Sequence, residues 1–505
     1  MAAFDLRPPY AEAPDVRVSY NLGGTLDVCT GKFLKGRHGE YILNGGLAAT
    51  TGIVGIGNNM KSTLQAAMML IPMSYTPESQ ANLYDTEFHV NKARISELSQ
   101  KIPAFANEDI IETGRLSVSS KSEYHANEWY EVFKEYNKNK IANAKRFSRK
   151  TPFINWRKRS CIEVLVMTPH AIDSFSEFES EDMANMQEAN ELGDSGANTM
   201  HMRGGANKVR FLTDVPKYVH QGSSPLILTA HIGKTIQMDT RAAPVKTLQY
   251  LKNGDAIKGA GSKFAFMTTN CWQAQNAAPL INDTTKAPEF PRDKNDATKF
   301  ETDLVNITFT SLRNKNGPSG FSLQLLVSQK EGFLPSLTEF FYLKNNKRFG
   351  FEGNDINYTL VLCPDIALSR TTVRTKIDKL PTLRRALNIL AELGQMTHMQ
   401  RVEHEDILLE PKDLYDKIKA RGYDWNMILK NTRGFWTYNN DLPFIQDEIP
   451  LYFLSTKDLL NMARGMYHPF WLNSDMKTIK SDEEITALGD AWDKSNTLAA
   501  AVTQE

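Results

Sequence analysis

Short apolar runs separated by longer amphipathic stretches dominate the chain from about residue 41 to residue 345. Such runs are typical of strands covered on both faces, and the amphipathic stretches are typical of the crossover helices that connect parallel strands. The pattern therefore predicts an α/β fold with a mainly parallel central sheet flanked by helices. The predicted strands are Gly52–Ile56, Ala81–Asp85, His170–Ser174, Pro225–Ala230, Phe264–Thr269, Leu304–Leu312 and Leu323–Ser328.

The pattern changes at about residue 350. Pro381–Met396 carries apolar residues at helical spacing, with a proline suited to the first turn, and Leu408–Ile418 and Leu454–Met466 look helical too. The sequence therefore predicts a small, mostly helical C-terminal domain over residues 351–480. Residues 481–505 hold six acidic residues and one lysine, so a disordered acidic tail is expected there.

Three segments depart from the alternating pattern. Residues 1–40 predict an N-terminal arm with a short strand or two, available for contact between subunits. Residues 121–160 hold eleven Lys or Arg against four Asp or Glu, with aromatic residues interleaved. This basic aromatic insertion fits either a DNA-binding surface or an amphipathic helix pair with aromatic core residues, and the helix pair is preferred. Residues 270–303, rich in Asn, Asp, Pro and Ala, predict a long loop.

The charge balance narrows the range of partners. The 505 residues include 59 Lys or Arg and 59 Asp or Glu, which excludes a globally basic coat for nucleic acid but not a local basic groove. The four cysteines lie far apart without a CxxC pair, so a thiolate zinc site or redox couple is not expected. The chain lacks an apolar signal core and an apolar stretch long enough for a membrane span, so a cytoplasmic protein without membrane contact is expected.

The stretch Gly55-Ile-Gly-Asn-Asn-Met-Lys-Ser62 matches the P-loop pattern, except that Met60 stands where a glycine is usual. An apolar strand precedes it and a helix-like run follows. In such a loop, backbone N–H groups surround the phosphates, Lys61 reaches the β- and γ-phosphates, and the Ser62 hydroxyl is a Mg²⁺ ligand. The alternative to a phosphate-binding loop is an ordinary strand–turn–helix connection in which Lys61 occurs by chance. The predicted ligands are ATP and Mg²⁺, and the predicted nucleotide-binding residues are Gly55, Gly57, Asn58, Asn59, Met60, Lys61, Ser62 and Thr63.

Three other predicted strands end in a residue with useful chemistry. Glu87 follows the strand at 81–85, Asp173 ends the next in the form of a Walker B element, and His231 ends the strand after it. Parallel sheets bind their ligands at these carboxyl ends. Asp173 is expected to hold Mg²⁺ together with Ser62, and His231 is placed to sense the γ-phosphate. Each of these residues alone also fits an ordinary surface or core position. The P-loop, Glu87, Asp173 and His231 in this order along the chain nevertheless favour one shared site.

Taken together, these motifs resemble the RecA-type recombinases, especially the phage UvsX-like members. The resemblance covers roughly residues 40–345 and implies a RecA-like P-loop core over residues 41–350. The chain departs from the family at Met60 and in the long interval between Glu87 and Asp173, which the basic aromatic insertion fills. The resembling stretches are Gly-Gly-Leu at 45–47, Leu-Tyr-Asp-Thr-Glu at 83–87, Ile-Asp-Ser at 172–174, Thr-Ala-His at 229–231, Gly-Ala-Gly-Ser-Lys at 259–263, Arg-Asn-Lys-Asn-Gly-Pro-Ser-Gly at 313–320 and Ser-Gln-Lys-Glu-Gly at 328–332.

The resemblance implies roles for these residues. Glu87 would polarise the attacking water beside the phosphate-binding Lys61, Asp173 would be the Walker B acid, and His231 would be the switch residue. Arg313 and Lys315 would enter the ATP site of a neighbouring subunit, although a plain basic turn fits them as well. Residues 232–262 would be the mobile DNA-binding loop, unless their cations are merely solvated. The expected DNA-binding residues are Lys234, Arg241, Lys246, Lys252, Lys258 and Lys263.

The function that follows is a DNA-dependent ATPase. It would assemble on single-stranded DNA as a helical filament, act on double-stranded DNA too, and promote homologous pairing and strand exchange in recombination, repair and replication. The C-terminal domain would meet replication or repair proteins, and a phage origin would place the protein in the host cytoplasm. Two alternatives stay open: a ring-shaped replicative helicase, against which only about 50 residues precede the P-loop, and a hydrolysis-poor DNA-binding mediator, which Met60 favours.

Overall fold

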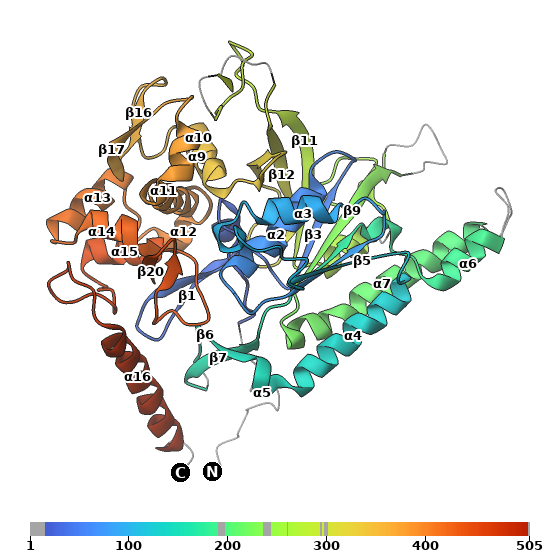
Figure 1. Cartoon of the computed structure of the whole chain (residues 1–505), viewed down its shortest axis with the longest axis horizontal. Helices are drawn as coiled ribbons and strands as arrows, with labels where there is room; N and C mark the ends of the chain where they lie inside the picture. The colour runs from blue at the N-terminus through green and yellow to red at the C-terminus, as the bar shows by residue number, and fades with distance from the viewer. Residues whose placement is uncertain are drawn as a thin grey trace.

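A large mixed sheet forms the centre of the computed structural model, which describes residues 16–156, 158–189, 197–235, 244–259, 261–292, 295–296 and 301–502. Its strands follow the order β14-β13-β12-β11-β3-β9-β8-β4-β5 (Figure 1). Neighbours run parallel from β11 to β5, whereas β12, β13 and β14 are antiparallel additions. The predicted mainly parallel sheet is therefore confirmed. The strands are β3 (Thr50–Gly55), β4 (Ala81–Asp85), β5 (Leu116–Ser120), β8 (His170–Asp173), β9 (Leu226–Lys234), β11 (Asn270–Pro279), β12 (Leu304–Asn314), β13 (Ser322–Ser328) and β14 (Gly332–Phe333).

Helices cover both faces of this sheet. In β3, Ile53 packs into a cluster with helix α2 (Lys61–Ser74), whereas its neighbour Val54 packs on the other face with α4 (Ala126–Ala142) and α7 (Ala197–Gly222). Strands β4, β8 and β9 divide their side chains in the same way. Because helices shield both faces of the sheet from solvent, these strands have the continuous apolar sequences from which they were predicted.

The predicted strand at Phe264–Thr269 is wrong. Ser262–Met267 forms helix α8, and strand β11 begins only at Asn270. Phe264 and Ala265 are buried beneath α7, and an apolar run of this length suits a buried helical turn as well as a strand. Strand β11 also occupies the start of the segment 270–303, where the sequence predicted a loop.

The basic aromatic insertion contains helix α4 and an antiparallel hairpin. Trp129 and Phe133 of α4 are buried against the sheet, next to Tyr84 and Phe178. The aromatic core role in the preferred interpretation is therefore confirmed for these two residues, but the predicted helix pair is wrong, because a β-hairpin stands where the second helix was expected. The nearby elements are α3 (Lys92–Ser99), α5 (Ala144–Phe147), β6 (Ser148–Asn155), β7 (Ser160–Leu165) and α6 (Glu181–Ala189).

Residues 16–40 fasten the C-terminal unit to the core. The side-chain amide of Gln395 donates a hydrogen bond to the carbonyl of Thr25 at 2.7 Å, and the indole N–H of Trp436 donates to the carbonyl of Ser19 at 3.1 Å. Residues 1–15 of the predicted arm lie outside the described part of the chain. The elements here are α1 (Leu26–Thr30) and β1 (Lys32–Lys35), which pairs with β2 (Tyr41–Asn44).

The C-terminal unit contains the predicted helices, as α11, α13 and α15, together with two small sheets that were not predicted, β15-β16-β17 and β18-β20-β19 (Figure 1). Their strands are short, and Cys363–Leu368 alternates only partly between buried and exposed positions, so they carry little periodic signal. The elements are α9 (Pro335–Asn345), β15 (Phe351–Gly353), β16 (Tyr358–Leu360), β17 (Cys363–Leu368), α10 (Val373–Lys379), α11 (Pro381–Met399), α12 (Arg401–His404), α13 (Pro411–Ala420), α14 (Trp425–Asn431), β18 (Thr432–Arg433), β19 (Phe444–Gln446), β20 (Ile449–Phe453) and α15 (Thr456–Arg464).

The acidic tail is helical, so the prediction of disorder is wrong over helix α16 (Asp482–Val502). Ser481 and Glu484 cap its start by reciprocal backbone and side-chain hydrogen bonds. Acidic residues in a first turn stabilise a helix through its dipole. Ile485 is fully buried in the C-terminal core. The acidity that suggested a solvated tail therefore belongs to a capped helix start.

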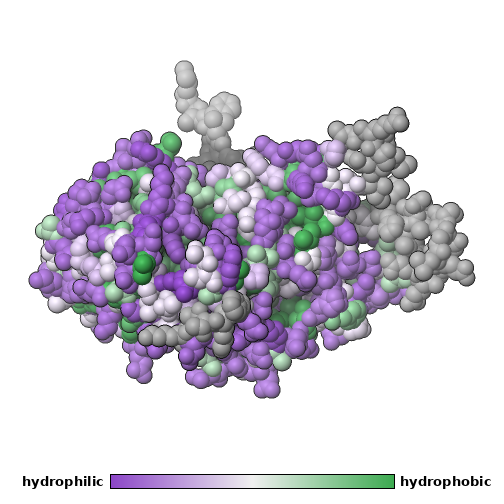
Figure 2. All heavy atoms as spheres, turned by 90° about the horizontal axis from the view of Figure 1, so that it is seen from above, coloured by the Kyte–Doolittle hydropathy of each residue, from purple (hydrophilic) through white to green (hydrophobic). Residues whose placement is uncertain are grey.

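The surface gives little sign of an extended apolar patch on the face seen from above, where hydrophilic groups dominate and hydrophobic groups form separate spots (Figure 2). Among the described helices, none combines the length and apolar character needed to cross a membrane. The four cysteines are buried free thiols.

Candidate nucleotide site

The loop that the sequence predicts to be a P-loop joins the carboxyl end of β3 to the start of α2. Because β3, β9, β8 and β4 run parallel, the residues that follow them gather at the same edge of the sheet. The structure accordingly brings Glu87, Asp173 and His231 together with the loop. Strand β9 lies between β3 and β8 in the sheet. Asp173, at the end of β8, is therefore two strands away from the loop that follows β3.

Close backbone packing shapes the loop. A Cβ on Gly55 would lie 2.5 Å from the carbonyl oxygen of Ala274, so only glycine fits there without a shift. The Asn59 amide donates a hydrogen bond to the same carbonyl at 2.9 Å. Asn58 and Met60 both have positive φ, of 60° and 55°. Met60 therefore adopts the backbone conformation that a P-loop glycine would provide.

Lys61 lies over the loop and donates a hydrogen bond from its Nζ to the carbonyl of Ile56 at 2.8 Å. Burial lowers the pKa of Lys61, while the carboxylates of Asp173 and Glu87 oppose that shift. An ammonium in this position, surrounded by loop backbone and two acids, is well placed to meet phosphate oxygens.

Asp173 connects the loop helix with the strands. Its carboxylate accepts hydrogen bonds from the Ser62 hydroxyl and from the Thr229 hydroxyl, the latter at 2.5 Å. Burial raises the pKa of Asp173, and these two hydrogen bonds lower it in part. A hydroxyl and a carboxylate are the protein ligands that Mg²⁺ takes beside nucleotide phosphates and water. In the described ranges, no group of three or more His, Cys, Asp or Glu side chains could hold a metal by itself.

Glu87 is held by a pair of hydrogen bonds. The Ser174 hydroxyl donates to Glu87 Oε1 at 2.5 Å, and His231 Nε2 lies 2.8 Å from the same oxygen. Burial raises the pKa of Glu87, but the hydrogen bonds from Ser174 and His231 outweigh it and leave the pKa lowered. The carboxylate is therefore ionised at neutral pH and fixed in direction, as a water-orienting base must be.

Sequence reasoning missed Ser174, Thr229 and Thr86. The Thr86 hydroxyl and the backbone of Ser174 exchange two hydrogen bonds of 2.8 Å, which join the ends of β4 and β8; the peptide bond between Asp173 and Ser174 is cis. Thr229 is a fully buried hydroxyl in the otherwise apolar first half of strand β9, at 226–230. That isolated polar residue is the signal that could have identified it.

The predicted DNA-binding loop begins directly after His231. Strand β9 continues to Lys234 beyond the sheet edge and pairs with β10 (Asp255–Ile257), where the Lys258 backbone N–H donates to the His231 carbonyl at 2.8 Å. Lys234 forms an ion pair with Asp255. Arg241 lies outside the described residues. The side chains of Lys246, Lys252, Lys258 and Lys263 are exposed.

Arg313 and Lys315 do not approach the P-loop of their own chain. Strand β12 is antiparallel to β11, and Arg313 lies opposite Cys271, near the amino end of β3. The guanidinium of Arg313 stacks over the ring of Phe266 at 4.6 Å. Both cations are thus at the sheet edge opposite the nucleotide site.

Comparison with protein-family models gave no match to this chain, and a search of curated proteins found no matching sequence either.

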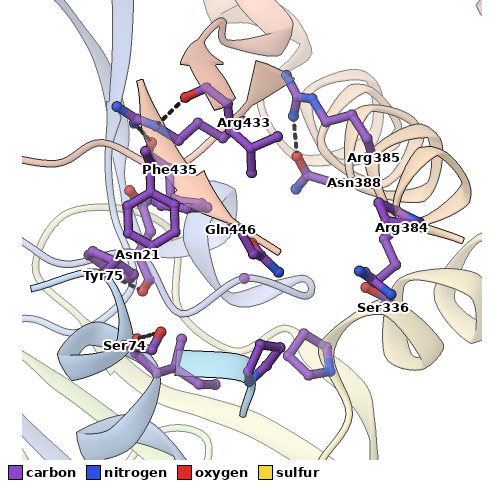
Figure 3. A pocket seen from close by; sticks show the side chains of 18 of the residues that line it. Asn21, Ser74, Tyr75, Ser336, Arg384, Arg385, Asn388, Arg433, Phe435 and Gln446 are labelled. Atoms are coloured by element: carbon purple, nitrogen blue, oxygen red, sulfur yellow. Dashed lines mark hydrogen bonds between the residues drawn. The ribbon is translucent and has the colours of Figure 1, made fainter. Parts of the chain in front are cut away.

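A cavity of about 460 Å³ lies between the core and the C-terminal unit, away from the predicted P-loop (Figure 3). Tyr75, just past the end of α2, forms one wall, and Arg384, Arg385 and Asn388 of α11 form another. The buried acids Asp27, Glu339 and Glu392 also line it. Burial raises the pKa of Asp27 to about 7 and raises that of Glu339 well above its usual range.

Met60 allows a direct test of the backbone strain in the loop. Met60→Ala and Met60→Gly remove the same packing, but only glycine relieves the positive φ. We therefore expect Met60→Gly to be more stable than Met60→Ala by about 1 kcal/mol in urea unfolding. Equal stabilities would show that residue 60 is free to leave the left-handed conformation. The same pair of variants at Ile56, where φ is not positive, is the control.

Glu339 predicts a pH dependence of stability. Its folded-state pKa is raised, so the folded protein binds a proton that the unfolded chain loses above about pH 4.5. Stability from this group is therefore lost as pH rises through its folded-state pKa. Since glutamine cannot ionise, the urea midpoint of Glu339→Gln should rise relative to wild type between pH 5 and pH 8. The exposed Glu97→Gln should show no such trend, and a parallel trend in both variants would contradict the assignment.

Proposed function

We propose that the chain has a RecA-like P-loop core and is a DNA-dependent ATPase, which assembles on single-stranded DNA and promotes homologous pairing and strand exchange. The observation that carries this proposal is the meeting of Lys61, Ser62, Asp173 and the Glu87–His231 pair at one sheet edge. A phosphate loop, a metal-binding pair and a fixed carboxylate are the parts that ATP hydrolysis requires.

Each residue would have a separate part in hydrolysis. The loop backbone and Lys61 would bind the phosphates, and Ser62 with Asp173 would hold Mg²⁺, whose charge would stabilise the developing negative charge. Glu87 would orient the attacking water and accept its proton. The hydrogen bond from Ser174 keeps Glu87 in the required direction, and the ring of His231 lies on the same oxygen.

The connection between His231 and the β9–β10 loop supports dependence on DNA. A shift of this loop on binding a phosphate backbone would move His231 through the Lys258 hydrogen bond and so alter its contact with Glu87. Exposed lysines on the loop favour binding through counterion release, which makes affinity salt-dependent.

The opposite positions of the nucleotide site and Arg313 support assembly head to tail. In that arrangement, the Arg313 and Lys315 edge of one copy would meet the P-loop edge of the next. Apolar side chains are exposed on both edges: Ile56 and Phe88 are 60% and 61% exposed beside the P-loop, and Phe266 is 49% exposed beside Arg313. A head-to-tail interface yields a helical filament or, if it closes, the ring of a helicase.

The first test is ATP hydrolysis with and without single-stranded DNA. Lys61→Ala and Glu87→Gln should each lower DNA-stimulated turnover by about 100-fold or more, because they remove phosphate binding and water orientation. The exposed Lys92→Ala and Glu97→Gln are matched controls and should retain turnover. If wild type binds DNA yet hydrolyses no faster than the two site variants, the mediator function would replace the ATPase.

The second test is complementation between variants. Arg313→Ala/Lys315→Ala keeps the P-loop intact, and Lys61→Ala keeps both cations intact. An equal mixture should recover about one quarter of the wild-type rate, because random head-to-tail pairing joins an intact loop to intact cations in about one interface of four. If both variants still assemble on DNA but their mixture recovers no activity, Arg313 and Lys315 do not act at the P-loop of a neighbouring copy. Electron microscopy of the wild type on DNA then separates open filaments from closed rings.

A further inference from the structure

A second, smaller cavity of about 180 Å³ lies at the sheet edge opposite the P-loop. It is bounded by residues just before β4 and β8, by helix α4 and by the start of the β6 strand. The polar residues that line it are Glu78, Gln80, Tyr136, Lys140, Arg146, Arg149 and Thr168.

Lys140 lies at the base of this cavity and is only 4% exposed. Its Nζ donates a hydrogen bond to the Thr168 hydroxyl at 2.8 Å, and no carboxylate pairs with it in the described part of the chain. Burial lowers the pKa of Lys140 to about 7. Burial and the nearby Lys140 lower the pKa of His170 to about 3, so this ring is neutral and adds no positive charge beside Lys140. Burying a charged lysine without a paired anion is costly, and the lowered pKa of Lys140 reflects that cost.

The rim of the cavity adds further positive charge. Arg149 pairs with Glu78 through its Nε at 2.8 Å. Arg146 packs over the Phe147 ring at 5.4 Å and has no ion pair within the described residues. The described charged groups of the cavity are thus three cations and one carboxylate. The Tyr136 and Thr168 hydroxyls hydrogen-bond to each other at 3.0 Å, which leaves one of their two hydroxyl protons to donate to a ligand.

We propose that this cavity binds a phosphate group, with Lys140 as its central ligand and Arg146 at its entrance. Clustered cationic and hydroxyl donors around a small space match a tetrahedral oxyanion. Because Lys140 is at the base, a protruding phosphate reaches it, whereas a phosphodiester lying along the surface does not. The ligand is therefore inorganic phosphate or a terminal phosphate monoester, such as a 5′-phosphorylated nucleic-acid end.

The test uses the full chain carrying Lys61→Ala, so that phosphate binding at the P-loop does not contribute. Inorganic phosphate at constant ionic strength should raise the melting temperature of this protein. Adding Lys140→Met should reduce phosphate affinity about tenfold or more, since a charge-assisted hydrogen bond is lost. Lys138 is an exposed lysine on the same helix. Lys138→Met should therefore leave the phosphate-induced rise in melting temperature unchanged. Without phosphate, the melting temperature of the protein with both substitutions should be no lower than that of the Lys61→Ala protein. This comparison verifies that Lys140→Met still folds.

The source of the phosphate is distinguished by competition. A 5′-phosphorylated oligonucleotide that competes for the site, where its 5′-hydroxyl counterpart does not, would identify a nucleic-acid end as the ligand. Competition by neither oligonucleotide would identify free phosphate. A shift that survives Lys140→Met, or no shift with phosphate in the Lys61→Ala protein, would overturn the proposal and leave the ATPase assignment untouched.

Discussion

The carboxylate of Asp173 is the interaction on which the arrangement of the site depends. It accepts hydrogen bonds from Ser62, in the first turn of the loop helix, and from Thr229 on the neighbouring strand, so it fixes α2, β8 and β9 relative to one another. Glu87 faces it and raises its pKa. Two carboxylates beside one partly desolvated lysine leave a net negative charge at the site, which would favour a bound cation.

Much of this arrangement could be predicted from the sequence, because parallel strands impose a simple rule. Residues that follow buried strands meet at one edge, so the order of the P-loop, Glu87, Asp173 and His231 along the chain was enough to expect a shared site. Their contacts could not be predicted. Ser174 and Thr229 take part through side-chain geometry that spacing does not encode, and Arg313 needed the antiparallel turn of β12 to place it at the far edge.

The failures of prediction have a common physical cause, which is that tertiary burial decides what local pattern leaves open. Phe264 fits a strand or a helical turn equally well, and its burial beneath α7 selects the helix. Ile485 anchors α16 in the C-terminal core, and that contact orders a segment whose charge alone suggested disorder. The short strands at Tyr358–Leu360 and Cys363–Leu368 form because the C-terminal core covers one side of them.

Met60 shows why a mismatch in a motif need not mean a different loop. Glycine is usual at this position of the P-loop pattern and adopts a positive φ without strain, and Met60 itself has a φ of 55°. The side chain packs against the hydrophobic cluster beneath α2, and this burial offsets a backbone cost of about 1 kcal/mol. Residue 60 therefore has the left-handed backbone that glycine adopts readily, while a packed side chain replaces the freedom of glycine.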